Sequence, residues 1–287
     1  MFPAVIDFYD RHPINEGQIL EAVRRRGKDP AALLPEDLYD FDQDHYGGLA
    51  AVEALARRAA IGPASRVLDV CAGLGGPARF LARQAGARVV GVDLNEGRCA
   101  AARRLTRLVG LSGQVCFARG DAQALPFGNG VFTAVVSQEG LLHVPDKALV
   151  LAECARVLAP GGRIAFTDWV AHPRLSDGER RRLQEWMVAV TIQTIGGYRE
   201  LLAKAGFSGI EAEDLSAEWV GILKERLRMY RSLREETVAR FGQRRYDEYN
   251  QLYEFFVGLV EAGRLGGARV SAGIAPGTVS ALSDPRG

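Results

Sequence analysis

The residues with the clearest chemical potential lie where two apolar runs end, on either side of a glycine-rich turn. In VLDVCAGLGGPARFLA, an apolar run reaches Asp69 and is followed by a turn that contains Gly73 and Gly75. Glycines in such a turn let the backbone approach a ligand where a side chain would collide with it. Twenty residues after Gly73, the run VVGVD ends in Asp93, whose carboxylate can accept hydrogen bonds from the two hydroxyls of a ribose. The pattern predicts a nucleoside-binding turn between a strand and a helix.

Two kinds of nucleoside ligand are compatible with this turn. GLGGPA and its distant acid also satisfy the G-x-G-x-x-A pattern of NAD-binding Rossmann domains. Against that interpretation, Asp69 directly precedes the loop, where a carboxylate would crowd a pyrophosphate but could face a cationic group. A positively charged ligand without phosphates therefore fits better, and an NAD-dependent oxidoreductase is the alternative.

Asp121 and Ala122 follow the third expected strand, in the segment RGDAQALPF. There the carboxylate can accept a hydrogen bond from the exocyclic amine of adenine, while the alanine packs near the ring. Further along, LAPGGRIAFTDW forms a tight turn that leads into a fifth strand. These features favour an adenine-containing ligand at the ends of the strands.

His143 and Asp168 follow the ends of the fourth and fifth expected strands, facing the same pocket. Together they can act as a general base and its orienting carboxylate for a hydroxyl acceptor. The alternative is that His143 caps a loop and Asp168 makes a structural hydrogen bond.

The segments that position these residues alternate short β-rich runs with helical runs, as is typical of βαβ units and a parallel sheet. Pro77 fits the first turn of a helix that Gly86 ends, and Asn95 and Asp146 can cap two later helices. Ligands of such sheets bind at the carboxyl ends of the strands, at the point where the strand order reverses. The expected strands are 66–70, 88–93, 115–118, 132–137 and 163–168, and later 210–215 and 268–272.

We therefore expect an α/β fold: a Rossmann-like, seven-stranded, mainly parallel sheet with an N-terminal helical segment and a helical lid inserted before the last strand. Helices are expected at 176–190 and 198–205, and long charged helices at 217–262. The expected divisions are a helical cover at 1–60, a binding core at 61–215, a lid at 216–264, a final strand at 265–274 and a disordered tail at 275–287.

Composition excludes several classes of protein. The 287 residues include 36 Lys and Arg and 35 Asp and Glu, without a basic cluster, which argues against a nucleic-acid partner. No apolar run is long enough to cross a membrane, and the start MFPAVIDFYD lacks the features of a secretory signal, so we expect a cytoplasmic protein. The four cysteines are far apart in the sequence, so neither a disulfide framework nor a metal site is expected.

The glycine turn, the ribose acid, the acid after the third strand and the proline-glycine turn occur in this order in the class I S-adenosylmethionine-dependent methyltransferases. The chain resembles that family over residues 65–169 and, more loosely, to the last strand. Within it, DQDHYGG, SQEGLLHV and FTDW resemble the sarcosine and dimethylglycine N-methyltransferases and the sugar O-methyltransferases of natural-product pathways. Cys71 departs from the family pattern, because it replaces the first glycine of the loop and leaves a reactive role open.

The resemblance implies an enzyme that transfers a methyl group from S-adenosylmethionine to a nitrogen or oxygen of a small polar metabolite, by in-line displacement. It implies His143 and Asp168 as catalytic residues, no membrane or nucleic-acid partner, and a monomer or homodimer. SQEG stands where enzymes that methylate base amines or glutamine amides carry an Asn/Asp-Pro-Pro-aromatic run, which disfavours those substrates. A relative that binds the cofactor without transferring a methyl group is a further alternative.

The segment PEDLYDFDQDHYGG is too polar and aromatic for a simple linker, so it is expected to close over the cofactor near its sulfonium. An amphipathic entry helix with solvated charges is the alternative. The residues expected at the cofactor are Tyr39, Tyr46, Asp69, Cys71, Ala72, Gly73, Gly75, Asp93, Leu94, Asp121, Ala122, Ser137 and Gln138.

Overall fold

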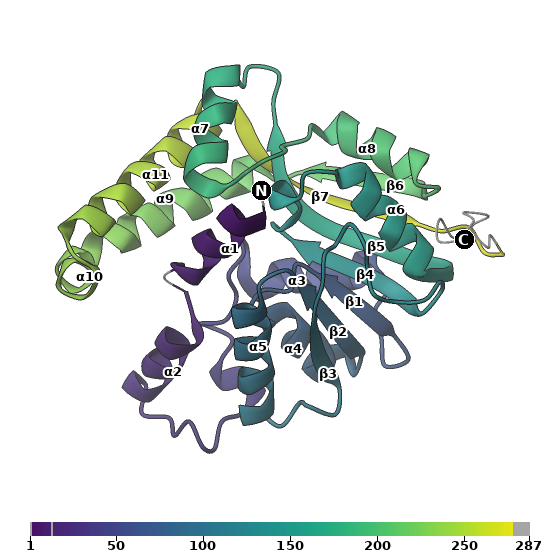
Figure 1. The fold of residues 1–287 in the computed structure, drawn as a ribbon, viewed down its shortest axis with the longest axis horizontal. Coiled ribbons are helices and arrows are strands. Elements are labelled where there is room, and N and C mark those ends of the chain that lie inside the picture. The colour runs from purple at the N-terminus through teal and green to yellow at the C-terminus, as the bar shows by residue number, and fades with distance from the viewer. Residues whose placement is uncertain (1, 13, 278–287) are drawn as a thin grey trace.

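A seven-stranded sheet runs through the centre of the molecule, with helices on both of its faces (Figure 1). The computed structural model describes residues 2–12 and 14–277. The strand order is β3-β2-β1-β4-β5-β7-β6, and within the described chain only β7 runs antiparallel to its neighbours. The strands are β1 (Arg66–Val70), β2 (Arg88–Asp93), β3 (Val115–Arg119), β4 (Phe132–Gln138), β5 (Leu158–Ala171), β6 (Ser208–Asp214) and β7 (Leu265–Gly273).

Local capping explains where several helices begin and end. The side chains of Asn95 and Asp146 accept hydrogen bonds from backbone amides three residues later, as expected for N-caps. Gly86 adopts a left-handed conformation, φ 67°, and ends α4. The helices are α1 (Phe2–Asp10), α2 (Glu16–Arg25), α3 (Gly48–Arg58), α4 (Gly76–Ala85), α5 (Glu96–Leu108), α6 (Lys147–Val157), α7 (Asp177–Met187), α8 (Ile195–Lys204), α9 (Ser216–Ser232), α10 (Arg234–Phe241) and α11 (Gln243–Glu261), with 3-10 turns η1 (Pro35–Asp37) and η2 (Leu141–His143).

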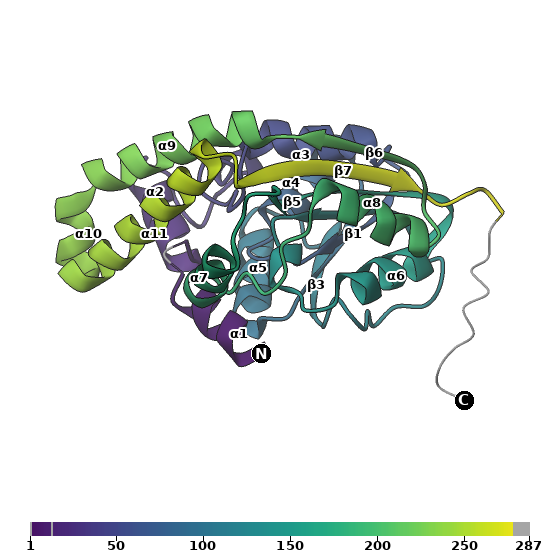
Figure 2. The ribbon, with the colours of Figure 1, turned by 90° about the horizontal axis from the view of Figure 1, so that it is seen from above.

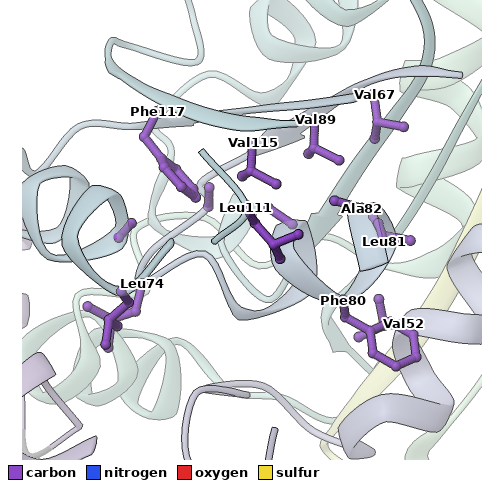
Figure 3. Close-up of a cluster of buried hydrophobic side chains, with 14 of the residues drawn as sticks. Val52, Val67, Leu74, Phe80, Leu81, Ala82, Val89, Leu111, Val115 and Phe117 are labelled. Atoms are coloured by element: carbon purple, nitrogen blue, oxygen red, sulfur yellow. The ribbon is translucent and has the colours of Figure 1, made fainter. Parts of the chain in front are cut away.

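The side chains of each strand alternate between two cores, one on each face of the sheet. Val67, Val89 and Val115 pack with α3, α4 and α5 in the cluster shown in Figure 3. Leu68, directly after Val67, points to the opposite face of the sheet. So does Val92, three residues after Val89, and both side chains pack with α6 and α8. Because helices pack on the apolar side chains of both faces, the faces of the parallel strands are not accessible to a ligand. A ligand can bind at the polar ends of the strands.

A third apolar cluster joins α7, α9 and α11 to the ends of β5 and β7. Trp219 of α9 lies directly on Gly267 of β7, where an added Cβ would meet the indole at 2.4 Å. Its ring also contacts that of Trp169 in β5, with the centroids 5.0 Å apart. Figure 2 shows α9 and α11 side by side and connected by α10, extending past the sheet at the start of β7. The helices inserted before the last strand therefore reach the edge where β5 ends.

The structure confirms the expected fold class and differs from the expected elements in detail. β5 begins at Leu158 instead of 163, because the proline-glycine turn itself joins the ladder beside Phe132. α7 ends at Met187, before Val188 at φ 54°, instead of at 190. Residues 26–47 contain η1 but no α-helix. The division of the chain into cover, core, lid and final strand stays an interpretation. The expected disordered tail falls mainly on residues 278–287, which lie outside the described residues.

Among the described helices, none combines the length and the apolar character that crossing a membrane requires.

A buried ion pair fixes the segment before α3 against the sheet. Arg79 of α4 donates from Nη2 to Oδ2 of Asp42 at 2.9 Å, and from Nη1 to Oγ1 of Thr106 at 3.2 Å. The side chains of Arg79 and Asp42 are 1% and 0% exposed. Burial raises the pKa of the Asp42 carboxyl, and the guanidinium of Arg79 opposes that rise. The pair therefore holds residues 42–46 in place only while both charges are present.

We expect Arg79→Met to lower the free energy of unfolding by about 3–5 kcal/mol, because it leaves the Asp42 carboxyl buried without its partner. Urea unfolding of the two proteins measures the difference. The matched control is Arg83→Met on the same helix: the Arg83 and Glu36 side chains are 52% and 40% exposed, so this change should lower the free energy of unfolding far less than Arg79→Met does. Equal effects of the two substitutions would contradict this role of the buried pair.

Candidate functional site

A pocket lies at the carboxyl ends of β1, β2 and β4, where the strand order reverses between β1 and β4. We name it the switch-point pocket. Its walls come from the loops after β1, β2, β3 and β4, from α1, and from residues 42–45. Because parallel strands present their carboxyl ends at the same edge, residues far apart in the sequence meet here.

The glycine turn forms the floor of this pocket and needs small residues for two reasons. Gly73 and Gly75 have φ of 53° and 76°, a conformation that other residues rarely adopt. At Gly75 a Cβ would lie 2.3 Å from the ring of Phe117, and at Gly76 it would lie 2.2 Å from the carbonyl oxygen of Asp42. The turn is therefore packed from behind, and its open side faces the pocket.

Two carboxylates flank the turn, the half-buried Asp93 and the buried Asp69. Asp93 accepts hydrogen bonds from the backbone amides of Gly73 and Asn95, both at 2.9 Å. Asp69 is 3% exposed, and its Oδ2 atom has no hydrogen-bond partner among the described residues. Burial, together with the negative charge of Asp93, raises the pKa of Asp69 to about 8. A buried acceptor without a partner is costly, so Asp69 marks a place where a ligand can donate.

Gln138, at the end of β4, offers a second acceptor of this kind. Its amide nitrogen lies 3.0 Å from Nδ1 of His45, and its Oε1 atom is buried without a hydrogen-bond partner in the part of the chain that the structure describes. Gln138 lines the same pocket as Asp69. The pocket therefore presents two unsatisfied oxygen atoms, which favours a ligand with N–H or O–H donors.

Most of the residues expected at the cofactor surround the switch-point pocket. Asp121 is held there by the backbone amide of Gln123 at 2.9 Å. Its neighbour Ala122 is also part of the lining. The ten expected residues that line the pocket are Asp69, Cys71, Ala72, Gly73, Gly75, Asp93, Leu94, Asp121, Ala122 and Gln138.

Three expected residues lie elsewhere. Tyr39 packs its ring on Phe80 of α4, with the centroids 5.3 Å apart. Ser137 points away from the pocket, and its hydroxyl donates to the carbonyl oxygen of Val70 at 2.7 Å. Tyr46 lines a neighbouring chamber instead. The positions of Tyr39 and Ser137 follow from helix packing and from strand alternation, which the local sequence motif did not reveal.

His143 and Asp168, the expected base and its orienting carboxylate, each form hydrogen bonds with other residues. Nδ1 of His143 lies 3.0 Å from the carbonyl oxygen of Val188, and its Nε2 lies 2.9 Å from the hydroxyl of Tyr9. Asp168 is completely buried and accepts hydrogen bonds from the amide of Leu142 and the hydroxyl of Tyr198. Asp168 therefore anchors the turn that carries His143 and does not orient the ring directly. His143 lines the pocket, whereas Asp168 does not.

The sequence motifs missed one wall of the pocket, which α1 provides. Val5, Ile6 and Tyr9 line it from the N-terminal helix, and the guanidinium of Arg98 lies 4.5 Å from the centre of the Tyr9 ring. The apolar pattern of FPAVIDFYD was the available signal for a buried helix face.

Glu139 was also missed, although it lies within SQEG. It adopts φ 46°, which is unusual for a residue other than glycine. Its carboxylate accepts hydrogen bonds from the amide of Tyr46 at 2.8 Å and from the hydroxyl of Thr167 at 2.6 Å. Burial raises the pKa of Glu139 to about 7. An acid with this pKa is present in both protonation states near neutral pH.

A second cavity, which we name the aromatic chamber, adjoins the switch-point pocket. Tyr9, Asp44, Glu139 and His143 line both cavities. The chamber wall includes Tyr46, whose ring lies against those of Trp169 and Trp219. Two ligands, one in each cavity, would therefore meet at the four shared residues.

Comparison with known proteins agrees with this architecture. Residues 68–166 match the family described as "Methyltransferase domain". The chain is 35% identical over 169 residues to methyltransferase GfsG of Streptomyces halstedii, covering 58% of this chain and 61% of that protein. It is 34% identical over 190 residues to the glycine/sarcosine/dimethylglycine N-methyltransferase of Actinopolyspora halophila, covering 66% of this chain and 34% of that protein. The chain thus covers less than two thirds of either relative's length.

Solved structures share the fold of almost the whole chain. Phosphoethanolamine N-methyltransferase 2 of Haemonchus contortus, in complex with S-adenosyl-L-methionine, superposes with a TM-score of 0.76 at 24% identity, covering 95% of this chain and 60% of that one. A putative sarcosine dimethylglycine methyltransferase of Galdieria sulphuraria gives a TM-score of 0.74 at 19% identity, covering 92% and 99%. These matches confirm the resemblance to class I methyltransferases at the level of fold.

Cys71, which replaces a loop glycine, is expected to be chemically inert. It sits at φ 60° beside Gly140, and burial raises the pKa of its thiol well above the usual value. The thiolate is the reactive form, so iodoacetamide at pH 8 should modify the exposed Cys116 at least about tenfold faster than Cys71. Peptide mass spectrometry measures both rates, with Cys116→Ser as the control. If Cys71 were modified as fast as Cys116, this prediction would be wrong and a reactive role for Cys71 would be supported.

Proposed function

We propose that this protein transfers a methyl group from S-adenosylmethionine to a nitrogen or oxygen of a small metabolite, by in-line displacement. The observation that carries the proposal is the unsatisfied Oδ2 atom of Asp69 beside the glycine turn. The relatives named above are methyltransferases, and two of them are named for small amine substrates. The nearly balanced charge of the chain supports a small acceptor over a nucleic acid.

The residues of the switch-point pocket fit this cofactor. The ammonium group of its methionine part would donate to Asp69 and Gln138, the two residues with unsatisfied oxygens. Asp93 would receive the ribose hydroxyls, and Asp121 and Ala122 would face the adenine. The bound sulfonium supplies an electrophilic methyl group, so the protein needs to align the acceptor, exclude water and remove a proton. A dinucleotide fits less well, because its pyrophosphate would lie against the carboxylate of Asp69.

His143 is the proposed general base for a hydroxyl acceptor. Burial lowers its pKa to about 4, so the ring is neutral at physiological pH. The carbonyl oxygen of Val188 at Nδ1 assigns the ring proton to that atom, so Nε2 is the acceptor and receives the hydroxyl of Tyr9 at 2.9 Å. A hydroxyl acceptor would replace Tyr9 at this nitrogen or transfer its proton through the Tyr9 hydroxyl. Asp168 would act as a positioning residue through the amide of Leu142. An amine acceptor would need no strong base, and His143 would then bind and orient it. The monomeric or homodimeric state and the cytoplasmic location expected from the sequence stay predictions.

Calorimetry with S-adenosylmethionine and with NADH tests the cofactor assignment. We expect saturable binding of S-adenosylmethionine and none of NADH, and we expect Asp93→Ala to weaken binding at least about tenfold, because ribose hydrogen bonds to a charged acceptor are lost.

Incubation with metabolite extracts, followed by mass spectrometry, then tests transfer. We expect S-adenosylhomocysteine together with a product that has gained one methyl group. The control is His143→Ala, which should retain the cofactor but form product at a rate lower by about 100-fold or more for a hydroxyl acceptor. Binding of NADH instead of S-adenosylmethionine would favour the oxidoreductase, and tight binding without any product would favour a binding protein.

The affinity for S-adenosylmethionine should rise with pH. Asp69, with its pKa at about 8, is mostly protonated at pH 6. A cationic group binds the ionised form, so binding releases a proton, and the association constant should increase by up to about tenfold per pH unit between pH 6 and 8. Calorimetry in two buffers of different ionisation enthalpy measures the released proton. In Asp69→Asn this dependence should disappear; an unchanged slope in that variant would assign it to another group.

A further inference from the structure

The composition of the aromatic chamber constrains the methyl acceptor. Eleven of its sixteen lining residues are aromatic or aliphatic. Four of its five polar residues are His12, Asp44, Glu139 and His143, and the last three of these belong to the junction with the switch-point pocket. The fifth, Arg226, stacks on the Tyr46 ring at 4.5 Å and donates to the carbonyl oxygen of His45. The carboxylates and one imidazole thus lie where methyl transfer would occur, and the rest of the chamber is mainly aromatic and aliphatic, with His12, Arg226 and the hydroxyls of three tyrosines as its other polar groups.

The chamber continues into a groove between α1, α7 and α11. Phe8, Tyr249 and Leu252 line both the chamber and this groove, which we name the α1/α7/α11 groove. Trp186 extends the apolar surface of the groove along α7. Of two adjacent residues of α7, Trp186 therefore lines the groove and Met187 lines the chamber.

Four of the five charged residues at the rim of the groove are paired with one another, whereas the exposed Glu185 has no ion-pair partner among the described residues. Arg11 lies 3.8 Å from Asp7, and Arg245 lies 3.5 Å from Glu248. A second nitrogen of Arg245 donates to the carbonyl oxygen of Arg11 at 3.0 Å and so connects α11 to α1. Because these charges have local partners, the groove does not require a charged ligand to satisfy them.

α1 separates the groove from the switch-point pocket. One face of the helix, with Val5, Ile6 and Tyr9, lines the pocket, whereas the face with Ala4, Asp7, Phe8 and Arg11 lines the groove. Spacings of three and four residues place the members of the second set on one side of a helix. A molecule in the groove can therefore reach the chamber without crossing the site proposed for the cofactor.

We propose that the methyl acceptor is an amphiphile: its reacting polar atom lies at the junction beside Glu139 and His143, its apolar body fills the aromatic chamber, and its far end leaves through the α1/α7/α11 groove. This inference rests on the proposed function and specifies the acceptor. The polar character expected from the sequence then applies to the reacting end. The chamber favours the apolar body because each buried methylene group contributes to affinity.

Homologous 1-alkylamines and 1-alkanols with two to ten carbons test this proposal, since they add apolar length to a constant polar end. Binding to the protein loaded with S-adenosylhomocysteine is measured by calorimetry and by the fluorescence of Trp169, which lines the chamber. For at least one series, we expect the association constant to rise about threefold to fourfold per methylene group. Affinity that is independent of length in both series, or no binding in either, would overturn the proposal.

Variants of the groove separate specific from non-specific binding of the longer probes. Ala4 and Gln251 are exposed on facing helices of the groove, so Ala4→Trp/Gln251→Trp should narrow it without disturbing the core. We expect at least about tenfold weaker binding of the longest probe that the normal protein binds, and unchanged binding of the shortest one. The matched control is Arg244→Trp, because Arg244 lies on α11 outside the groove. This variant should bind the longest and the shortest probe as the normal protein does. Equal binding of the long probe to the narrowed protein and the control would also overturn the proposal.

S-adenosylmethionine binding in the same samples distinguishes the two levels of inference. If the normal protein does not bind it, the proposed function fails. If it does bind and the probes show neither length dependence nor sensitivity to the narrowed groove, only the amphiphilic acceptor is wrong.

Discussion

Two carboxylates at the ends of adjacent strands, the buried Asp69 and the half-buried Asp93, impose the main constraint on this structure. β1 and β2 pair in parallel, so Asp69 and Asp93 reach the same edge of the sheet. Backbone amides satisfy Asp93, whereas Asp69 keeps an oxygen without a partner. Burial and the negative charge of Asp93 disfavour the ionised form of Asp69, and a cationic ligand group beside Asp69 relieves that cost. The glycine turn leaves space for such a cation, and α1 with residues 42–45 limits the access of water.

The proposed position of that cationic group fits the arrangement of the two cavities. The aromatic chamber meets the switch-point pocket at residues from α1, from the 42–45 segment and from η2, each held by a different set of contacts. The buried Arg79–Asp42 pair holds one of these segments, and the hydrogen bond from Leu142 to Asp168 holds another. Alignment of an acceptor therefore depends on packing some distance from the reacting atoms, which is typical of a reaction catalysed chiefly by positioning.

Local sequence signals were sufficient for the core of the fold. β1 and β2 begin and end at the expected residues, because apolar runs bounded by turns and by capping residues determine them. The extension of β5 back to Leu158 was not visible, since pairing with β4 and not local preference places that turn in the ladder. Ten residues of the pocket were found because they belong to contiguous motifs. Glu139 and Tyr9 escaped prediction: the strained backbone of the first and the docking of α1 depend on tertiary contacts.

A crystal structure with S-adenosylmethionine or S-adenosylhomocysteine bound is the most direct test of the central claim. We expect the ammonium group within hydrogen-bond distance of the Asp69 carboxylate, the ribose hydroxyls on Asp93, and the sulfur directed toward the junction with the aromatic chamber. A ligand whose ammonium group lies away from Asp69, or a nicotinamide dinucleotide spanning the glycine turn, would contradict it.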